Sequence, residues 1–501
     1  MNLSILVLIP ALTAAAILFF KELKQIRMIA FLGAALQLVL SVVLLAQFCA
    51  ERATGNTAPM LFYSAYSWFP ELGISYTTGI DGISMAMILL AALVVISGVL
   101  VSWKMEKLSR EFFFLLMLLS AGAYGFFISL DLFTLFFFLE IAVIPKFLLI
   151  GVWGSGKKEY SAMKLALMLM AGSALVFLGL LGVYFNSSDA AGLHTFDLTL
   201  IAANAIPLNA QLIFFPLAFV GFGIFGALFP FHTWVPDGHS SAPTAASMFL
   251  AGISMKLGGY GCLRVATYLM PEAAHEYAPF IILLSAIAIL YGAFATMMQT
   301  DLKYINAYSS VSHCGFVLLG IGMLNQTGIT GAVMQMISHG LMTALFFAAI
   351  GMIYERTHTR MVAQLGGLLK VMPFISSIFV IAGLCSLGLP GFSGFVSEMT
   401  VFMGSWEHTE PLYRIATIAS CASIVVTAVY ILRAAGKAIM GPIKDEHHLQ
   451  LSDATWNEKL AAVLLLAGIV IIGIAPFWLN DLITPGVNNL MANIGRNLLP
   501  Y

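Results

Sequence analysis

Long apolar segments separated by short polar stretches make up most of this sequence. Most of them are close to the roughly 20 residues that an α-helix needs to cross a bilayer. A membrane β-barrel would instead show segments of about ten residues with alternating polarity. The pattern predicts an all-α integral membrane protein with about fourteen transmembrane helices. The predicted spans cover residues 3–20, 28–50, 83–103, 111–130, 132–153, 161–185, 210–231, 243–264, 277–298, 304–324, 329–353, 372–405, 414–436 and 458–480.

Proline interrupts two of these segments at corresponding places. The seventh carries Pro230 and Pro236, and the long twelfth segment is broken at Pro390. The two lie five spans apart, so a repeat of spans 4–8 in spans 9–13 has the opposite orientation. Paired broken helices in inverted halves indicate an ion site in a transporter-like fold. We therefore predict two inverted five-helix repeats with broken helices 7 and 12. The expected units are N-terminal spans (1–110), two half-channels (111–264 and 265–436), and a loop with span 14 (437–501).

The charged residues support this arrangement. Only 9% of the 501 residues are charged, compared with about 25% in a soluble domain. The net charge of −1 argues against a nucleic-acid partner. Of the 23 lysines and arginines, three fall inside spans, and sixteen of the other twenty fall on one side of the predicted topology. The four exceptions are Arg52, Arg264, Arg414 and Arg496. Because positive residues concentrate on the cytoplasmic side, we expect a multi-pass protein of a bacterial inner membrane with both termini outside.

Five titratable residues lie at similar depth within five different spans. Glu140, Lys256 and Glu398 lie about eight residues from the outer ends of their spans, and His313 and His339 lie ten or eleven residues in. At 1.5 Å per residue these depths are about 12–16 Å. Ionisable residues inside a bilayer are costly and usually functional. A row of them across the membrane plane predicts a lateral proton relay.

Structural explanations compete with this interpretation. The two glutamates could be neutral, hydrogen-bonded acids, and the two span histidines could only link helices. Lys256 could be a structural tie to a backbone carbonyl, and Lys164 is expected to extend to the membrane surface. For His232 and His239, beside the first helix break, we expect a capping role together with Asp237.

The residues around these positions form a recognisable pattern. It includes FHTWVPDGHSSAPTAASMFLAGISMKLGGYGCLR, DLKYINAYSSVSHCGF, AVMQMISHGLMTALFF and LFFFLEIAVIPKFLLIGVWG. It resembles the antiporter-like subunits of proton-pumping NADH:quinone oxidoreductase, respiratory complex I. LGLPGFSGFVSE and YSWFPELGISYTTGIDGIS are most similar to its M-chain class, equivalent to mitochondrial chain 4. The resemblance implies a switching acid, a lysine, two histidines and a terminal acid, which correspond to Glu140, Lys256, His313, His339 and Glu398.

One feature departs from the family. Its members usually carry a lysine in the seventh span as the partner of the fifth-span glutamate, but residues 211–231 contain no basic residue. Lys146 instead stands six residues after Glu140. An isolated lysine there would commonly extend towards the interface at Trp153. We predict instead that Lys146 turns towards the seventh span near Phe225 and replaces the missing charge.

Together these features predict a proton-translocating membrane subunit of a complex I-type enzyme. The resemblance implies that flavin, iron–sulfur clusters and quinone belong to partner subunits. The absence of phosphate-loop and dinucleotide motifs in this sequence fits that expectation, so we expect no cofactor on this chain. The expected partners are the other membrane-arm subunits, including neighbouring antiporter-like subunits, and the lipid bilayer. The alternatives are a subunit of a multisubunit cation/proton antiporter or of a membrane-bound hydrogenase-type complex. A purely structural membrane anchor is a third possibility, which the row of ionisable residues disfavours.

Overall fold

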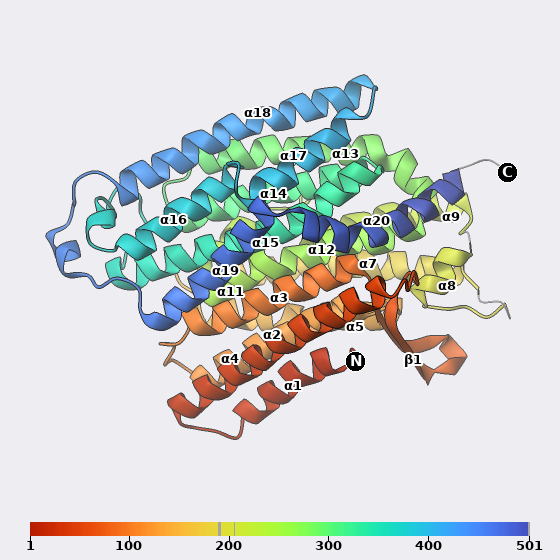
Figure 1. Ribbon diagram of the computed structural model, residues 1–501, viewed down its shortest axis with the longest axis horizontal. Helices are drawn as coiled ribbons and strands as arrows, with labels where there is room; N and C mark the ends of the chain where they lie inside the picture. Colours follow the sequence, from red (N-terminus) through yellow and green to blue (C-terminus); the bar gives the residue numbers. More distant parts are fainter. Residues whose placement is uncertain (189–191, 205, 499–501) are drawn as a thin grey trace.

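The computed structural model describes residues 1–188, 192–204 and 206–498, with side chains as far as Gly495. The protein is an elongated bundle in which most helices run along one axis (Figure 1). The first helices are α1 (Ile5–Ile17), α2 (Leu23–Ala53), α3 (Gly82–Val101), α4 (Ser109–Ile128), α5 (Leu132–Ile141), α6 (Val143–Trp153), α7 (Lys158–Phe185), α8 (Leu198–Ala203), α9 (Leu208–Phe225), α10 (Trp234–Ser241), α11 (Thr244–Phe249) and α12 (Met255–Gly261). They are followed by α13 (Pro271–Met297), α14 (Leu302–Gly322), α15 (Gln326–Thr357), α16 (Pro373–Ser386), α17 (Ser393–Trp406), α18 (Pro411–Ala434), α19 (Trp456–Ile474) and α20 (Phe477–Leu498). Shorter turns are the π-helical η2 (Leu250–Ser254), η3 (Cys262–Thr267) and η5 (Ala435–Ile439), and the 3₁₀-helical η1 (Pro70–Leu72), η4 (Leu368–Lys370) and η6 (Glu446–Gln450).

Ten helices in the described part of the chain are long and apolar enough to cross a membrane, with α5 and α6 counted together. The protein is therefore a mostly helical, multi-pass membrane protein, as predicted. The other four predicted spans fall on α1, on α11 to η3, on α14 and on α16 with α17. These helices are shorter, interrupted or more polar, so the count of fourteen stays a prediction. The hydrophobic stretch of α15 is completely covered by neighbouring helices, which makes α15 the centre of the bundle.

The predicted helix breaks are confirmed. α9 and α10 are separated around Pro230, and α16 and α17 are separated around Pro390. A third break lies between α5 and α6 at Ala142. It immediately precedes the turn that contains Pro145, whose missing N–H removes one helical hydrogen bond. The eighth predicted span is also irregular, because η2 and η3 flank α12 on either side.

A β-hairpin makes the all-α prediction wrong in one place. β1 (Leu61–Phe69) and β2 (Ile74–Ile80) pair in antiparallel fashion and project from one end of the bundle (Figure 1). The turn ends at Gly73, whose positive φ of 63° suits glycine. The backbone N–H of Leu130 donates to the carbonyl of Thr77 at 2.8 Å, which joins the hairpin to the α4–α5 junction. The strands went unrecognised because they are short and lie in a segment that hydropathy assigns to a loop.

The C-terminal region also differs from the prediction. The span expected at 458–480 ends with α19 at Ile474, and residues 477–498 form the separate helix α20. Its buried Ile483, Val487, Leu490 and Ile494 recur at helical spacing, whereas its other face is rich in asparagine. α20 is thus amphipathic and too polar for an apolar-segment search. It runs towards the hairpin end of the bundle, where the N-terminus also lies (Figure 1).

Candidate functional site

Lys256 is buried in the middle of the bundle, on the short helix α12 between the two π-helical turns. Only 1% of the residue is exposed. Its Nζ donates to the Ala251 carbonyl of η2 at 2.5 Å and lies 2.9 Å from Nδ1 of His339 on α15. Turns of this kind free backbone carbonyls and often occur at functional sites. The carbonyl tie considered as a structural alternative is therefore present, but it accompanies a contact with a second titratable group.

The two predicted histidines lie next to each other. The imidazole rings of His339 and His313 have centroids 5.4 Å apart and planes inclined by 30°. Both side chains are buried, at 1% and 3% exposure. The thiol of Cys314 lies 3.8 Å from Nδ1 of His339. A neutral imidazole can accept a proton on one nitrogen and release one from the other, so this pair can pass a proton from α15 to α14.

Glu398 stands at the far end of this row, beside the break between α16 and α17. Its Oε1 lies 3.2 Å from Nδ1 of His313, at ion-pair distance. Nε2 of His313 lies 3.0 Å from the Ser386 hydroxyl, in the last turn of α16. A Cβ placed on Gly388 would come within 2.8 Å of Oε2 of Glu398. The helix break thus provides the space that the carboxylate occupies.

Glu140 and Lys146 lie on opposite sides of the break between α5 and α6, and within the described residues the Lys146 ammonium has no hydrogen-bond partner. Glu140 is half-buried and accepts a hydrogen bond from the Ser173 hydroxyl on α7. Lys146 is 1% exposed, and its Nζ lies 5.7 Å from the ring centroid of Phe225. The expected turn of Lys146 towards Phe225 is therefore present in the structure, and the alternative path to the interface is not. Within the described residues, no hydrogen bond or ion pair joins Glu140 to the row that begins at Lys256, and their similar depth in the sequence did not reveal this separation.

The expected capping role of the two histidines near the first break is wrong. Among the described residues, Asp237 contacts the Lys164 ammonium at 2.7 Å and the Tyr304 hydroxyl at 3.2 Å, and neither histidine. His232 stacks on aromatic rings, and both ring nitrogens of His239 lack a hydrogen-bond partner. Asp237 takes the lysine because an ammonium is a stronger partner for a carboxylate than a neutral imidazole. Lys164 therefore lies at the end of the bundle, as expected, but its ammonium is paired with the Asp237 carboxylate.

Two cations assigned to loops are buried. Arg264 forms an ion pair with Asp81, at the start of α3, in which both side chains are 1% exposed. Its guanidinium also lies over the rings of Tyr260 and Tyr268. Lys303 is 3% exposed, and its Nζ donates to a carbonyl at 2.7 Å. In the sequence, the feature that indicates the Arg264–Asp81 pair is Asp81 itself, the acid in GIDGIS directly before an apolar span. Arg496 lies beyond the described side chains.

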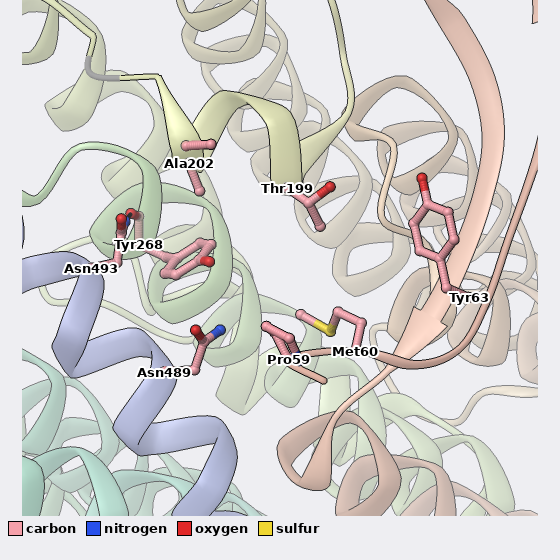
Figure 2. Close-up of a pocket in the computed structure, with 9 residues that line it drawn as sticks. Pro59, Met60, Tyr63, Thr199, Ala202, Tyr268, Asn489 and Asn493 are labelled. Atoms are coloured by element: carbon pink, nitrogen blue, oxygen red, sulfur yellow. Dashed lines mark hydrogen bonds between the residues drawn. The ribbon is translucent and has the colours of Figure 1, made fainter. Parts of the chain in front are cut away.

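Two cavities open at opposite ends of the bundle. One, of about 610 Å³, is lined by polar residues that include Lys157, Ser241 and Arg360, together with the Asp237 carboxylate. The other, of about 330 Å³, lies between the hairpin, α8 and α20, and Figure 2 shows Tyr63 and the other lining side chains. This second cavity contains none of the predicted relay residues. The polar cavity is likewise lined by none of them.

Comparison with known proteins matches residues 129–427 to the family described as NADH:quinone oxidoreductase/Mrp antiporter, transmembrane. NAD(P)H-quinone oxidoreductase chain 4-2 of Synechocystis sp. is 39% identical over 370 residues, which cover 73% of this chain and 66% of that protein. NADH-quinone oxidoreductase subunit M of Rickettsia bellii is 33% identical over 98% of both chains.

The similarity extends to three-dimensional structure. A chain of respiratory complex I from Thermus thermophilus, solved with bound NADH, superimposes with a TM-score of 0.89. The match covers 99% of this chain and 100% of that chain at 25% identity. The matched family region contains Glu140, Lys256, both span histidines and Glu398. On these grounds the chain belongs to the NADH:quinone oxidoreductase/Mrp antiporter transmembrane family.

Proposed function

We propose that this chain is an M-chain-type, proton-translocating subunit of the membrane arm of a complex I-type NADH:quinone oxidoreductase. The observation that carries the proposal is the contiguous row Lys256–His339–His313–Glu398. Its members come from four different helices. Nζ of Lys256 lies 2.9 Å from Nδ1 of His339, and Nδ1 of His313 lies 3.2 Å from Oε1 of Glu398. The centroids of the two imidazole rings are 5.4 Å apart. A chance burial of four titratable groups in an apolar bundle would be energetically costly.

The row is suited to moving a proton laterally between the two halves of the bundle. The Lys256 ammonium donates towards a bare Nδ1 of His339, and the second imidazole passes the proton to the Glu398 carboxylate. The step between the two rings is short enough to be bridged by one water or by rotation of a ring. Glu398 then delivers the proton to the outer side or to a neighbouring subunit.

Glu140 and Lys146 act in this proposal as the switching pair of the first half-channel. Lys146 supplies the positive charge from α6, the helix that follows α5, because Phe225 occupies the facing position on α9. Lys146→Met should abolish coupled pumping, and adding Phe225→Lys should restore part of it by returning a charge to this space. Phe222→Lys in the Lys146→Met background is the control, because it adds a lysine elsewhere on α9. Equal pumping by the Lys146→Met variant and the unmodified protein would remove Lys146 from the mechanism.

The proposed topology has fourteen spans, with inverted repeats over spans 4–8 and 9–13, and both termini on the outer face of a bacterial inner membrane. The ten long apolar helices and the two proline breaks support it. The proposed units are 1–110, 111–264, 265–436 and 437–501, and the last of them includes α20 besides span 14. Cysteine-accessibility labelling of loop residues from each side of the membrane tests this arrangement.

Flavin, iron–sulfur clusters and quinone are assigned to partner subunits, and this chain contributes proton transfer coupled to their electron transfer. A cation/proton antiporter subunit is the second candidate, because the family named above also includes Mrp antiporters. Affinity purification of the tagged full-length chain in mild detergent separates the two. We expect flavin and iron–sulfur subunits to copurify with quinone reductase activity. Recovery of only small hydrophobic partners would overturn the proposal in favour of the antiporter.

A further inference from the structure

Gln335 and Ser397 contact the proposed relay although neither side chain titrates. Both are 1% exposed. Gln335 lies on α15, one turn before His339, and its Nε2 is 3.3 Å from Nδ1 of His313. The Ser397 hydroxyl on α17 donates to Oε1 of Gln335 at 2.5 Å. The amide therefore joins the helix that carries His339 to the helix that carries Glu398.

Nδ1 of His313 faces two groups with opposite requirements. Oε1 of Glu398, at 3.2 Å, can only accept a hydrogen bond while it is ionised, and Nε2 of Gln335, at 3.3 Å, can only donate. One ring nitrogen cannot donate and accept at the same time. A protonated Nδ1 is therefore satisfied by Glu398, and a bare Nδ1 is satisfied by Gln335.

The Ser397 hydroxyl anchors the far end of the amide. In the structure it donates to Oε1 of Gln335, with the Ser393 and Gly394 carbonyls also within reach, and Nε2 faces His313. Ser397 directly precedes Glu398 on α17. Glu398, which accepts from a protonated His313, and Ser397, which holds the Gln335 amide, thus lie in the same turn of α17.

We propose that Gln335 and Ser397 are positioning residues that keep Nδ1 of His313 hydrogen-bonded in both of its protonation states. This inference rests on the proposed relay function. Once Glu398 has passed its proton on, it is ionised and can only accept, so without the amide the bare nitrogen would be buried without a donor, and an unsatisfied buried polar group is strongly disfavoured. The amide therefore makes release of the proton by His313 less costly and lets the ring return to its proton-accepting state.

Other titratable groups surround this ring and contribute to any pH dependence. Lys256 and His339 stand beside the ring on its α12 and α15 side, and Cys385 on α16 and Tyr430 on α18 interact with its partner Glu398 on α17. Cys314 is adjacent in sequence. Substitution of Gln335 changes none of these groups, so a change in pH response can be traced to the amide.

The test is electron-transfer-driven proton pumping in inverted membrane vesicles, measured as a function of pH with the complete complex. For Gln335→Leu we expect about tenfold slower pumping, since loss of one hydrogen bond to a buried group is worth roughly this factor. Because the bare nitrogen is disfavoured, the alkaline limb of the profile should move up by about one pH unit, equivalent to about tenfold in proton affinity. Gln335→Met serves as a second variant if the leucine variant assembles poorly. Gln37→Leu, another buried glutamine on α2, is the matched control and should pump normally.

Ser397 supplies the independent arm. Ser397→Ala should shift the profile in the same direction by a smaller amount, and Ser397→Thr should restore it by keeping the hydroxyl. The double variant with Gln335→Leu should be no worse than Gln335→Leu alone, because coupled residues are not additive. An unchanged pH profile in both Gln335 variants, or fully additive effects, would overturn the inference. His313→Leu distinguishes failure of this inference from failure of the proposed relay, because normal pumping by that variant would refute the relay itself.

Discussion

Replacing His339 by leucine removes the middle of the proposed relay while keeping an apolar side chain of similar size. Lys256 would then lose the imidazole nitrogen that lies 2.9 Å from its Nζ, and His313 would lose the ring whose centroid lies 5.4 Å from its own, with an apolar side chain in place of the connecting group. Positioned proton-transfer groups typically contribute 10²–10⁴-fold to a rate. We therefore expect coupled pumping by His339→Leu to fall by at least about a hundredfold.

The alanine variant makes this expectation sharper. His339→Ala leaves space for about two water molecules beside Lys256, Cys314 and His313, and a polar cavity of this size is expected to be hydrated. It should therefore pump measurably faster than His339→Leu, and added imidazole should accelerate it further. The assay is quenching of a ΔpH-sensitive dye in inverted vesicles, with complex abundance checked on native gels. If the leucine variant assembles and pumps at the unmodified rate, His339 is not on the proton path.

Three further outcomes follow from other parts of the structure. Arg264→Met or Asp81→Leu should each cost about 3–5 kcal/mol by leaving one buried charge alone, and the double variant should recover part of it, as measured by thermal unfolding of the purified complex. Gly388→Ala should slow pumping because its Cβ meets the terminal carboxylate of the relay. Gly391 has a similar positive φ but open space around it, so Gly391→Ala should slow pumping much less. Equal effects of the two substitutions would contradict this. Burial raises the pKa of Asp131 to about 6, above its unfolded value, so its contribution to stability is full below about pH 4 and lost as pH rises through 6. Thermal unfolding of the purified complex should therefore lose less stability between pH 5 and pH 7 in an Asp131→Asn variant than in the unmodified protein, and an equal loss would refute this assignment.

The sequence was sufficient to predict a mostly helical, multi-pass membrane protein because burial in lipid imposes simple constraints. Helices that cross the bilayer must be long and apolar, and a proline break interrupts them visibly. The depth of Lys256 and Glu398 could be read from their distance to segment ends. Features without such constraints were missed. The hairpin and α20 lie at the end of the bundle. Polar and apolar residues are mixed there, so a hydropathy pattern does not predict secondary structure.

Partners across helices were the harder part of the site. Side chains of equal depth can lie on opposite sides of a bundle. Glu140 was therefore predicted at the depth of His339, but its hydrogen-bond partner is Ser173 and not a member of the row. The roles of Gln335 and Ser397 depend on which helices face each other, which no spacing along the chain records. The position of Lys146 was predictable because its helix geometry, a missing lysine and Pro145 all constrained it. Asp237 was assigned the wrong partner because Lys164 approaches from a distant part of the sequence.

In the proposed relay the proton can reside at either end, and a charge nearby can change which end is favoured. Lys256 and Glu398 are separated by two imidazole rings, so the attraction between them is weak at an effective dielectric constant of about 20. The cost of burying each ion is several kcal/mol. Local groups reduce this cost: the Ala251 carbonyl accepts from the ammonium, and the Ser386 hydroxyl and its neighbours support the imidazole beside the carboxylate. The two states therefore differ by an amount that one added or removed charge nearby can reverse, so a change at Glu140 or in a neighbouring subunit can decide where the proton resides.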